Sequence, residues 1–325
     1  MIDLIVAILT MFVSLVLLGR ASGITVESAM KLSRYFRISQ LAIGFLLLAF
    51  ATSLPELSVS VLSSGRGEGA IAAGNIFGSN IANILLIIGL SAFLHGVRIT
   101  WKGLREIGVL LLLTTLISAY IIFSGSVQNQ VLGFAEGAIL LLIFGAYCYD
   151  EIRKGRKYEH ANHAKPVKKE AALNAFLLFC GSIVVVLASS GFVVDSAVQI
   201  AKIAGVAESF IGATIIAIGT SLPELSIGLQ AVKKRRYAIF LGNAIGSNMI
   251  NLTLILGIGA LINPIYVQLP IFVAALLFAI AANTILLYVA SVHRGLGKAG
   301  GALFLLVYAV YIVTIFFLQL RELGG

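Results

Sequence analysis

Two near-identical decapeptides of this chain each place a proline and a glutamate in the middle of an apolar stretch. They are AFATSLPELS at 49–58 and AIGTSLPELS at 217–226. Pro55 and Pro223 cannot donate helical hydrogen bonds to the carbonyl groups four residues earlier. Carbonyl groups freed in this way inside an apolar environment persist only where they line a cavity or meet another partner. A bound cation would be such a partner.

A second polar motif follows each decapeptide: GNIFGSNIAN at 74–83 and GNAIGSNMIN at 242–251. Within these four segments, oxygen-bearing side chains recur four residues apart and therefore share one face of a helix. The pairs are Thr52 with Glu56, Ser79 with Asn83, Thr220 with Glu224, and Ser247 with Asn251. Hard cations such as Ca²⁺ and Na⁺ prefer carboxylate, hydroxyl, amide and carbonyl oxygens, whereas thiophilic metals do not. The spacing therefore predicts a site for hard cations.

The composition identifies the surroundings of these motifs. Of the 325 residues, 59% are hydrophobic and 11% are charged, and the mean hydropathy is +1.04. A soluble domain would carry about 25% charged residues. The chain is therefore predicted to be an all-α membrane protein that crosses the bilayer several times. Ten segments are long and apolar enough to span it: 2–19, 40–64, 70–94, 105–123, 130–149, 172–197, 208–232, 238–262, 268–290 and 301–319.

Glu56 and Glu224 carry the functional interpretation, because a charged carboxylate at the bilayer centre costs at least about 2.5 kcal/mol. The alternative is a protonated glutamate that is hydrogen-bonded inside the helix bundle, and its repetition in both decapeptides makes that reading the weaker one. Glu136 differs from them. It has no counterpart in the repeat, where Phe304 occupies the equivalent position, and it lies near the end of its span. We interpret Glu136 as an interfacial residue and not as a ligand.

The net charge of +9 does not indicate nucleic-acid binding, because the basic residues follow the positive-inside rule. When the segment RKGRKYEHANHAKPVKKE is assigned to the cytoplasm, most of the other basic clusters fall on the same side. These are Lys31, Arg34 and Arg37; Arg98, Lys102 and Arg105; 233–236; and Arg294 and Lys298. Both termini are then extracytoplasmic, in a multi-pass protein of the cell membrane.

A shift of 168 residues superimposes the two halves of the chain, so that 43–89 matches 211–257. Three parts are predicted: 1–149 as the first five-helix repeat, 150–171 as a basic cytoplasmic linker, and 172–325 as the second repeat. Because each repeat has an odd number of spans, the second must enter the bilayer inverted. Inverted repeats with Pro-broken helices are typical of secondary transporters whose site lies near the midplane.

The cysteines and the linker histidines, which could form disulfides or bind metals, are assigned no role. Cys148 and Cys180 lie in different apolar segments and predict neither a disulfide nor a metal site. His160 and His163 in the linker lack the cysteine or carboxylate pattern of a zinc site. No cofactor, nucleic acid or protein partner is indicated, so the expected partners are the lipid bilayer and the transported ions. The sequence is compatible with a monomer and leaves the oligomeric state open.

The duplicated TSLPELS and GNxxGSNxxN motifs resemble the α-repeats of the sodium/calcium exchanger branch of the cation/Ca²⁺ antiporter superfamily. The resemblance implies ten helices, of which the long first and sixth slide across a core of eight. It implies that Glu56 and Glu224 bind Ca²⁺ with the help of Thr52 and Thr220. It further implies Na⁺ sites formed by the carbonyls of Ala49 and Ala217, by Ser53, Ser221, Ser79 and Ser247, and by the same glutamates. By the same resemblance, Asn83 and Asn251 occupy the central positions on the third and eighth helices.

The sequence thus predicts a secondary active antiporter that exchanges Na⁺ for Ca²⁺ by alternating access at a shared midplane site. The alternative is an H⁺/Ca²⁺ (or other divalent cation) antiporter, because burial favours the protonated form of the same two glutamates. Several family members have an aspartate at the position of Asn251, which leaves ion stoichiometry and K⁺ involvement open. A passive cation channel fits inverted broken helices less well. No hydrolytic motif occurs in the spans, so an enzyme is not expected.

Overall fold

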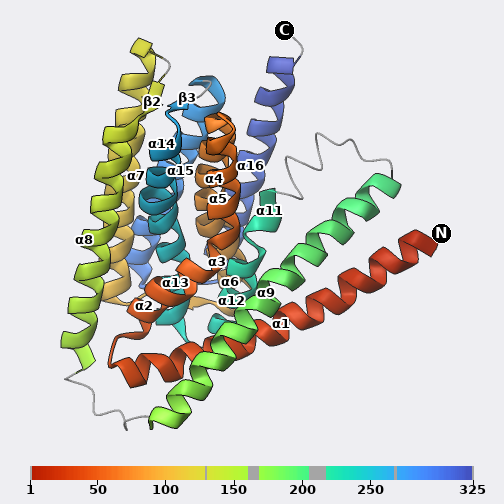
Figure 1. Ribbon diagram of the computed structural model, residues 1–325, viewed down its shortest axis with the longest axis vertical. Coiled ribbons are helices and arrows are strands. Elements are labelled where there is room, and N and C mark those ends of the chain that lie inside the picture. Colours follow the sequence, from red (N-terminus) through yellow and green to blue (C-terminus); the bar gives the residue numbers. More distant parts are fainter. Residues whose placement is uncertain (1, 129, 160–167, 205–216, 267–268, 324–325) are drawn as a thin grey trace.

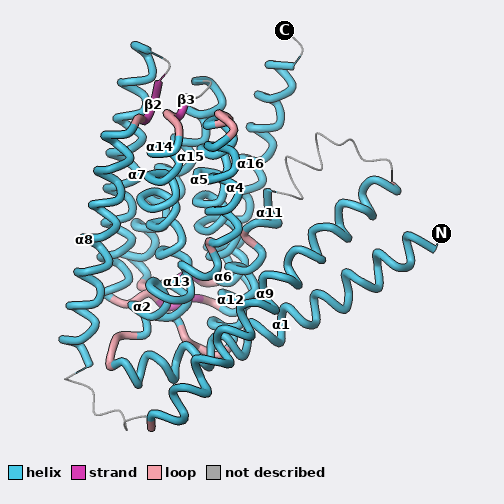
Figure 2. The backbone as a smooth tube through the Cα atoms, in the orientation of Figure 1, coloured by secondary structure: helices cyan, strands magenta, loops and turns pink. Residues whose placement is uncertain are grey.

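The computed structural model describes the chain except for residues 1, 129, 160–167, 205–216, 267–268 and 324–325. Nearly all of the described chain is helical, and the strands are four segments of two or three residues (Figure 2). The helices gather into an upright bundle, from which one pair of long helices leans away (Figure 1). The prediction of an all-α fold is confirmed.

The first repeat consists of a long helix followed by shorter ones. Its elements are α1 (Ile2–Phe36), α2 (Gln40–Ile43), η1 (Gly44–Ala49), α3 (Phe50–Thr52), α4 (Leu54–Gly65), α5 (Gly69–Ile81), η2 (Ala82–Ile88), α6 (Gly89–His95), β1 (Val97–Arg98), α7 (Trp101–Gln128), β2 (Gln130–Leu132) and α8 (Phe134–Glu159). The segments named η are π-helical turns that continue the flanking α-helices without a break.

The second repeat follows the same order. Its described elements are α9 (Lys169–Ile203), α11 (Ala217–Thr220), α12 (Leu222–Lys233), α13 (Tyr237–Ile250), η4 (Asn251–Ile255), α14 (Leu256–Ile262), β3 (Ile265–Tyr266), α15 (Leu269–His293), β4 (Gly295–Leu296) and α16 (Lys298–Leu323). Helices α8 and α9 reach into the segment expected as a linker, because its Glu, Lys and Arg residues are good helix formers. The strands tie the repeats together, since β1 pairs with β4 and β2 with β3, both antiparallel.

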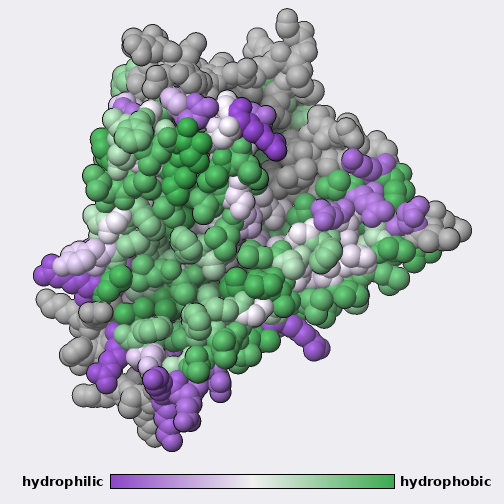
Figure 3. Space-filling model, in the orientation of Figure 1, coloured by the Kyte–Doolittle hydropathy of each residue, from purple (hydrophilic) through white to green (hydrophobic). Residues whose placement is uncertain are grey.

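Among the described residues, seven helices are long and apolar enough to cross a membrane, or eight if the bent pair 40–52 and 54–65 forms one span. Of the ten expected spans, 208–232 lies partly outside the described residues, and 130–149 corresponds to α8, which continues into charged sequence. The face of the molecule in Figure 3 is apolar over most of the bundle, with hydrophilic residues near its ends. This distribution fits a protein surrounded by lipid.

Helices α1 and α9 lie side by side along much of their length (Figure 1). Small residues allow the close contact, and the hydroxyl of Thr25 donates to that of Ser182 across it (2.8 Å). Large apolar side chains such as Phe12 and Phe176 point outward and are exposed. The pair therefore has one face toward the bundle and one toward lipid.

The first decapeptide forms a break, as its proline predicts. The helix 40–52 and the helix α4 meet at Ser53 with a bend of 50°. Pro55 lies in the first turn of α4, and Pro223 in the first turn of α12. A proline at the start of a helix costs nothing, because an N–H there would have no helical partner. Each proline therefore begins a half-helix immediately after the break.

The centre of the bundle is formed by the continuous helices 69–95 and 237–262. In each of these two helices, 78% of an apolar stretch of 18 residues is buried inside the protein. In α1 the corresponding share is 22%. Gly242 and Gly246 let α13 approach α2 and η1 closely. A Cβ atom at Gly246 would lie 2.7 Å from the Phe45 ring, and one at Gly242 would overlap the carbonyl oxygen of Leu41. These two glycines therefore allow α13 to pack directly against the backbone of the broken helix.

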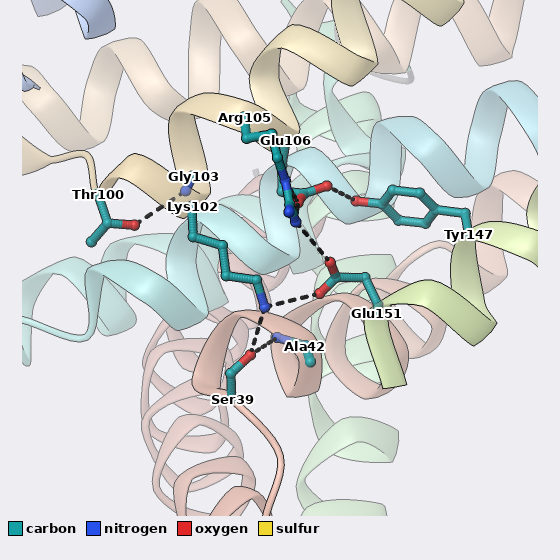
Figure 4. A network of polar contacts seen from close by, with 9 residues as sticks. All are labelled: Ser39, Ala42, Thr100, Lys102, Gly103, Arg105, Glu106, Tyr147 and Glu151. Carbon is teal, nitrogen blue, oxygen red and sulfur yellow. Dashed lines mark hydrogen bonds and ion pairs between the residues drawn. The ribbon is translucent and has the colours of Figure 1, made fainter. Parts of the chain in front are cut away.

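A polar network attaches the beginning of α2 to α7 and α8 (Figure 4). The hydroxyl of Ser39 caps α2 by accepting from the Ala42 N–H (3.1 Å), and it also accepts from Lys102 Nζ (3.0 Å). Lys102 in turn lies 3.3 Å from a carboxylate oxygen of the buried Glu151. Arg105 lies 3.9 Å from Glu151 and pairs with Glu106, whose carboxylate also accepts from the Tyr147 hydroxyl (2.7 Å). The first half of the broken helix is therefore anchored at the end that is remote from the break.

We expect Gly242→Ala to destabilise the protein strongly, because the new methyl group would collide with the backbone of α2. Overpacking of this kind costs about 1–3 kcal/mol. The apparent melting temperature in detergent measures the effect. The matched control is Gly74→Ala at the equivalent position of the first repeat, where an added Cβ meets nothing within 4 Å. Equal melting temperatures for the two variants would contradict the close approach.

Candidate functional site

Glu56 and Glu224 both lie in the first turn of the half-helix that follows a break. Each is 1% exposed, so both carboxyl groups are buried at the centre of the bundle. The N–H groups at a helix N-terminus carry a partial positive charge, which stabilises a nearby carboxylate. The breaks thus serve to create two helix N-termini where the glutamates stand.

Serine hydroxyls from neighbouring helices contact these carboxylates. Ser79 on α5 donates to Glu56 Oε1 (3.4 Å), and Ser247 on α13 donates to Glu224 Oε1 (3.5 Å). Ser53, at the first break, donates to the same Glu224 oxygen (3.4 Å). That last contact joins the repeats, so the two glutamates belong to one site. Their carboxyl groups also interact electrostatically.

Four asparagines bind the central helices to each other. Asn80 Nδ2 donates to the backbone carbonyl of Asn248 (3.4 Å), and Asn248 Nδ2 donates to that of Asn80 (3.1 Å). Asn83 Nδ2 donates to Asn248 Oδ1 (2.8 Å), and Asn251 Nδ2 donates to Asn80 Oδ1 (3.0 Å). The pattern has the two-fold symmetry of the repeats. We call these four residues the amide brace.

The hydrogen bonds of the amide brace and of the serines engage only some of the buried side-chain oxygens at the site. Within the repeated motifs, four buried carboxylate and amide oxygens have no hydrogen-bond donor among the described residues: Glu56 Oε2, Glu224 Oε2, Asn83 Oδ1 and Asn251 Oδ1. A buried oxygen without a partner costs about 1–3 kcal/mol. The four are two carboxylate and two amide oxygens, one of each from either repeat. This is the ligand chemistry of a hard cation.

The other predicted residues of the first repeat flank its break. The hydroxyl of Thr52 donates to the carbonyl of Ala49 (3.3 Å) and to Asn243 Oδ1 (3.4 Å). The Ala49 carbonyl also accepts from the Ser53 N–H (3.0 Å). This predicted Na⁺ ligand therefore already accepts a backbone hydrogen bond within the protein.

In the second repeat, Thr220 ends α11 and Ser221 forms the break before α12. Ser221 is buried and Thr220 half-buried. Ala217 begins α11, and only its backbone is described. The structure therefore brings Ser221 to the position that Ser53 holds in the first repeat.

Several other residues lie apart from the site. The Glu136 carboxylate accepts from the Tyr120 hydroxyl (2.7 Å) and from the Gly133 N–H (2.9 Å) at the start of α8. No group of three or more His, Cys, Asp or Glu side chains suited to a metal occurs among the described residues. Cys148 and Cys180 are unpaired. His160 and His163 lie outside the described part of the chain.

The sequence motifs did not show that Asn80 and Asn248 accept hydrogen bonds from Asn251 and Asn83 of the opposite repeat. The π-helical turns were not predicted either. Asn83 lies within η2 and Asn251 begins η4, and such turns are often found at functional sites. Nothing in the surrounding apolar sequence marks them.

The amino-acid sequence matches the protein family described as sodium/calcium exchanger protein over residues 6–150 and 174–317. The chain is 28% identical over 348 residues to the sodium/calcium exchanger MaX1 of Methanosarcina acetivorans, covering 95% of this chain and 98% of that protein. It is 26% identical over 223 residues to the Ca²⁺/H⁺ antiporter ChaA of Bacillus subtilis, covering 64% and 63%. These matches span both halves of the chain.

The fold is similar to a solved structure of the sodium-calcium exchanger NCX_Mj soaked with zero Na⁺ and Ca²⁺. The TM-score is 0.82 at 27% sequence identity, over 96% of this chain and 99% of that one. The expected architecture of two repeats is confirmed.

We expect Asn248→Leu to lower the apparent melting temperature, because it leaves Asn83 Nδ2 and the Asn80 carbonyl without partners at about 1–3 kcal/mol each. Asn83→Leu removes the other partner of the bond between Asn83 and Asn248. The double variant should cost less than the sum, because both substitutions remove the bond from Asn83 Nδ2 to Asn248 Oδ1. Thermal unfolding of the three variants in detergent tests this. Strictly additive losses would show that the two asparagines do not brace each other.

Proposed function

Because the chain belongs to the sodium/calcium exchanger protein family, it is a multi-pass membrane cation exchanger and not an enzyme, and we propose that it exchanges Na⁺ for Ca²⁺. In this proposal the four oxygens without donors hold the transported cations. The observation that supports it is their chemistry: two carboxylates and two amides from both repeats, buried together at the centre of the bundle.

Charge balance explains why one site would serve both ions. Two carboxylates neutralise one Ca²⁺ ion, or they can be shared by more than one Na⁺ ion. Ca²⁺ takes six to eight oxygens and tolerates irregular geometry. Ser79, Ser247, Ser53 and Ser221 supply further oxygens around the glutamates. Ca²⁺ and Na⁺ compete for the same ligands, so binding of one ion excludes binding of the other.

Mutual exclusion becomes exchange when the site opens to one side at a time. We assign the two sides to the two broken helices and the motion to α1 and α9, which pack mainly on each other and on the edge of the bundle. The Thr52 and Thr220 hydroxyls and the Ala49 and Ala217 carbonyls flank the breaks. They would contribute ligands when a broken helix moves.

The proposed setting is the cell membrane, with the linker between α8 and α9 in the cytoplasm and both termini outside. The basic residues of that linker and of the loops on its side favour this orientation. The end of α12 that carries Lys234 then faces the cytoplasm, and the end of α4 that carries Arg66 faces outward.

A second candidate is exchange of H⁺ for Ca²⁺ or another divalent cation. Two buried glutamates could each carry a proton in place of Na⁺. The similarity to the Ca²⁺/H⁺ antiporter ChaA supports this candidate. The duplicated TSLPE motif favours sodium.

We expect proteoliposomes loaded with Na⁺ to take up ⁴⁵Ca²⁺ when they are diluted into Na⁺-free buffer. Glu56→Gln and Glu224→Gln should each reduce this uptake at least tenfold, because the amide removes the charge that holds Ca²⁺. The matched control is Glu136→Gln, a half-buried carboxylate outside the site, which should retain uptake.

Uptake driven only by a pH gradient would assign the chain to the H⁺/Ca²⁺ candidate. Absence of Ca²⁺ uptake under either gradient, from correctly folded wild-type protein, would contradict both assignments of cargo.

A further inference from the structure

Polar contacts fasten α1 to α12 at one end of the bundle. Lys234 Nζ donates to Glu27 Oε1 (2.6 Å) and to the backbone carbonyl of Gly23 (2.7 Å). Next to Gly23 on α1, the Ser22 hydroxyl donates to that of Ser226 (2.8 Å), which lies about two turns before Lys234 on α12. These five residues form what we call the first latch. It holds the long helix α1 to the half-helix α12, which carries Glu224 in its first turn.

The internal repeat supplies an equivalent for every member of the first latch. Adding or subtracting 168 residues converts Ser22, Gly23, Glu27, Ser226 and Lys234 into Ser190, Gly191, Asp195, Ser58 and Arg66. Each position keeps its chemistry: two hydroxyls, a glycine, an acidic residue and a basic residue. The acidic member stands on α9 and the basic member at the end of α4.

The equivalent residues are not joined in this structure. The Ser58 hydroxyl donates to the Leu54 carbonyl of its own helix (2.9 Å), and the Ser190 hydroxyl to that of Leu187 (2.8 Å). Arg66 and Asp195 are exposed, and neither makes an ion pair with another described residue. Helix α1 packs along α12, but α9 makes no comparable contact with α4 in the described part of the chain.

The two basic residues are nevertheless presented by the same backbone geometry. Arg66 and Lys234 are the C-caps of α4 and α12. The next residue has a positive φ in both cases, 78° at Gly67 and 57° at Arg235. A left-handed residue after the cap closes the helix end in one defined way. Both cationic side chains therefore start from equivalent places relative to the half-helix that carries each glutamate.

We propose that Ser58, Arg66, Ser190, Gly191 and Asp195 form a second latch, between α4 and α9, in another conformation of this protein. The first latch opens when the second closes. This inference rests on the proposed function, because alternating access supplies the second conformation. Since α1 and α9 lie side by side, a shift of the pair that brings α9 onto α4 withdraws α1 from α12.

The alternation gives each state a similar set of contacts. Breaking the Lys234 contacts with Glu27 and Gly23 is offset by forming the Arg66 contacts with Asp195 and Gly191. The conformational equilibrium then stays close to balance, and the bound ions decide it. A ligand shifts such an equilibrium only by its difference in affinity for the two states.

Cross-linking between cysteine pairs tests the proposal. In a background with Cys148→Ser and Cys180→Ser, one variant carries Glu27→Cys with Lys234→Cys, and another carries Arg66→Cys with Asp195→Cys. A short, reducible bis-thiosulfonate reagent is applied in Na⁺, in Ca²⁺ and in the absence of both. Each pair joins the two halves of the chain, so a protease site in the linker between α8 and α9 reports the cross-link on a gel.

We expect both pairs to cross-link well above the single-cysteine variants, and each cross-link to stop transport until it is reduced. In a variant with all four cysteines, nearly every molecule should carry one cross-link only. Failure of the Arg66 and Asp195 pair in every ionic condition would overturn the proposal, and so would efficient formation of both links in one molecule. The gel does not depend on transport, so a failed Na⁺/Ca²⁺ assay would refute the proposed function separately.

Charge substitutions provide the second measurement. Lys234→Glu should raise cross-linking of the Arg66 and Asp195 cysteine pair at least twofold, because it opens the first latch. Lys233→Glu makes the same charge change at an exposed neighbour without an ion pair among the described residues, and it should have no such effect. Equal effects of the two substitutions would show that overall charge, and not the latch, sets the equilibrium.

Discussion

Two carboxylates buried in the apolar centre of a membrane protein are the constraint on which this structure depends. A charged group in that position is costly unless it meets helix N-termini, hydroxyls or a cation. The breaks at Ser53 and Ser221 create the helix N-termini, and the prolines that follow make those starts inexpensive. Ser79, Ser247 and Ser53 provide hydroxyls at 3.4–3.5 Å, but one oxygen of each glutamate has no donor in the part of the chain that the structure describes.

The amide brace makes the site a shared property of both repeats. It engages the Nδ2 atoms of Asn83 and Asn251, and their Oδ1 atoms have no donor among the described residues. The close approach at Gly242 and Gly246 holds the broken helix of the first repeat against the central helix of the second. The halves therefore form one core, while α1 and α9 pack along its edge.

Much of this arrangement follows from the sequence. The 168-residue repeat, the prolines and the glutamates together predicted two inverted half-sites, and the spacing of Ser79 with Asn83 predicted one helix face. The sequence could not indicate which amide nitrogen bonds to which oxygen, because Asn75, Asn80 and Asn83 are chemically alike and only packing distinguishes them. The π-helical turns and the unequal contacts of α1 and α9 with the half-helices arise from tertiary packing, which an almost symmetric sequence does not encode locally.

The central claim is that the four oxygens without donors surround the transported cation. Diffraction from crystals soaked in Sr²⁺, an anomalous scatterer that stands in for Ca²⁺, tests it most directly. We predict one strong anomalous peak at about the 2.3–2.6 Å ligand distance of Ca²⁺ from Glu56 Oε2 and Glu224 Oε2, with the Asn83 and Asn251 oxygens directed toward it. The peak should disappear in Glu56→Gln crystals. A strong peak elsewhere in the protein, with these oxygens bonded to other groups, would contradict the account.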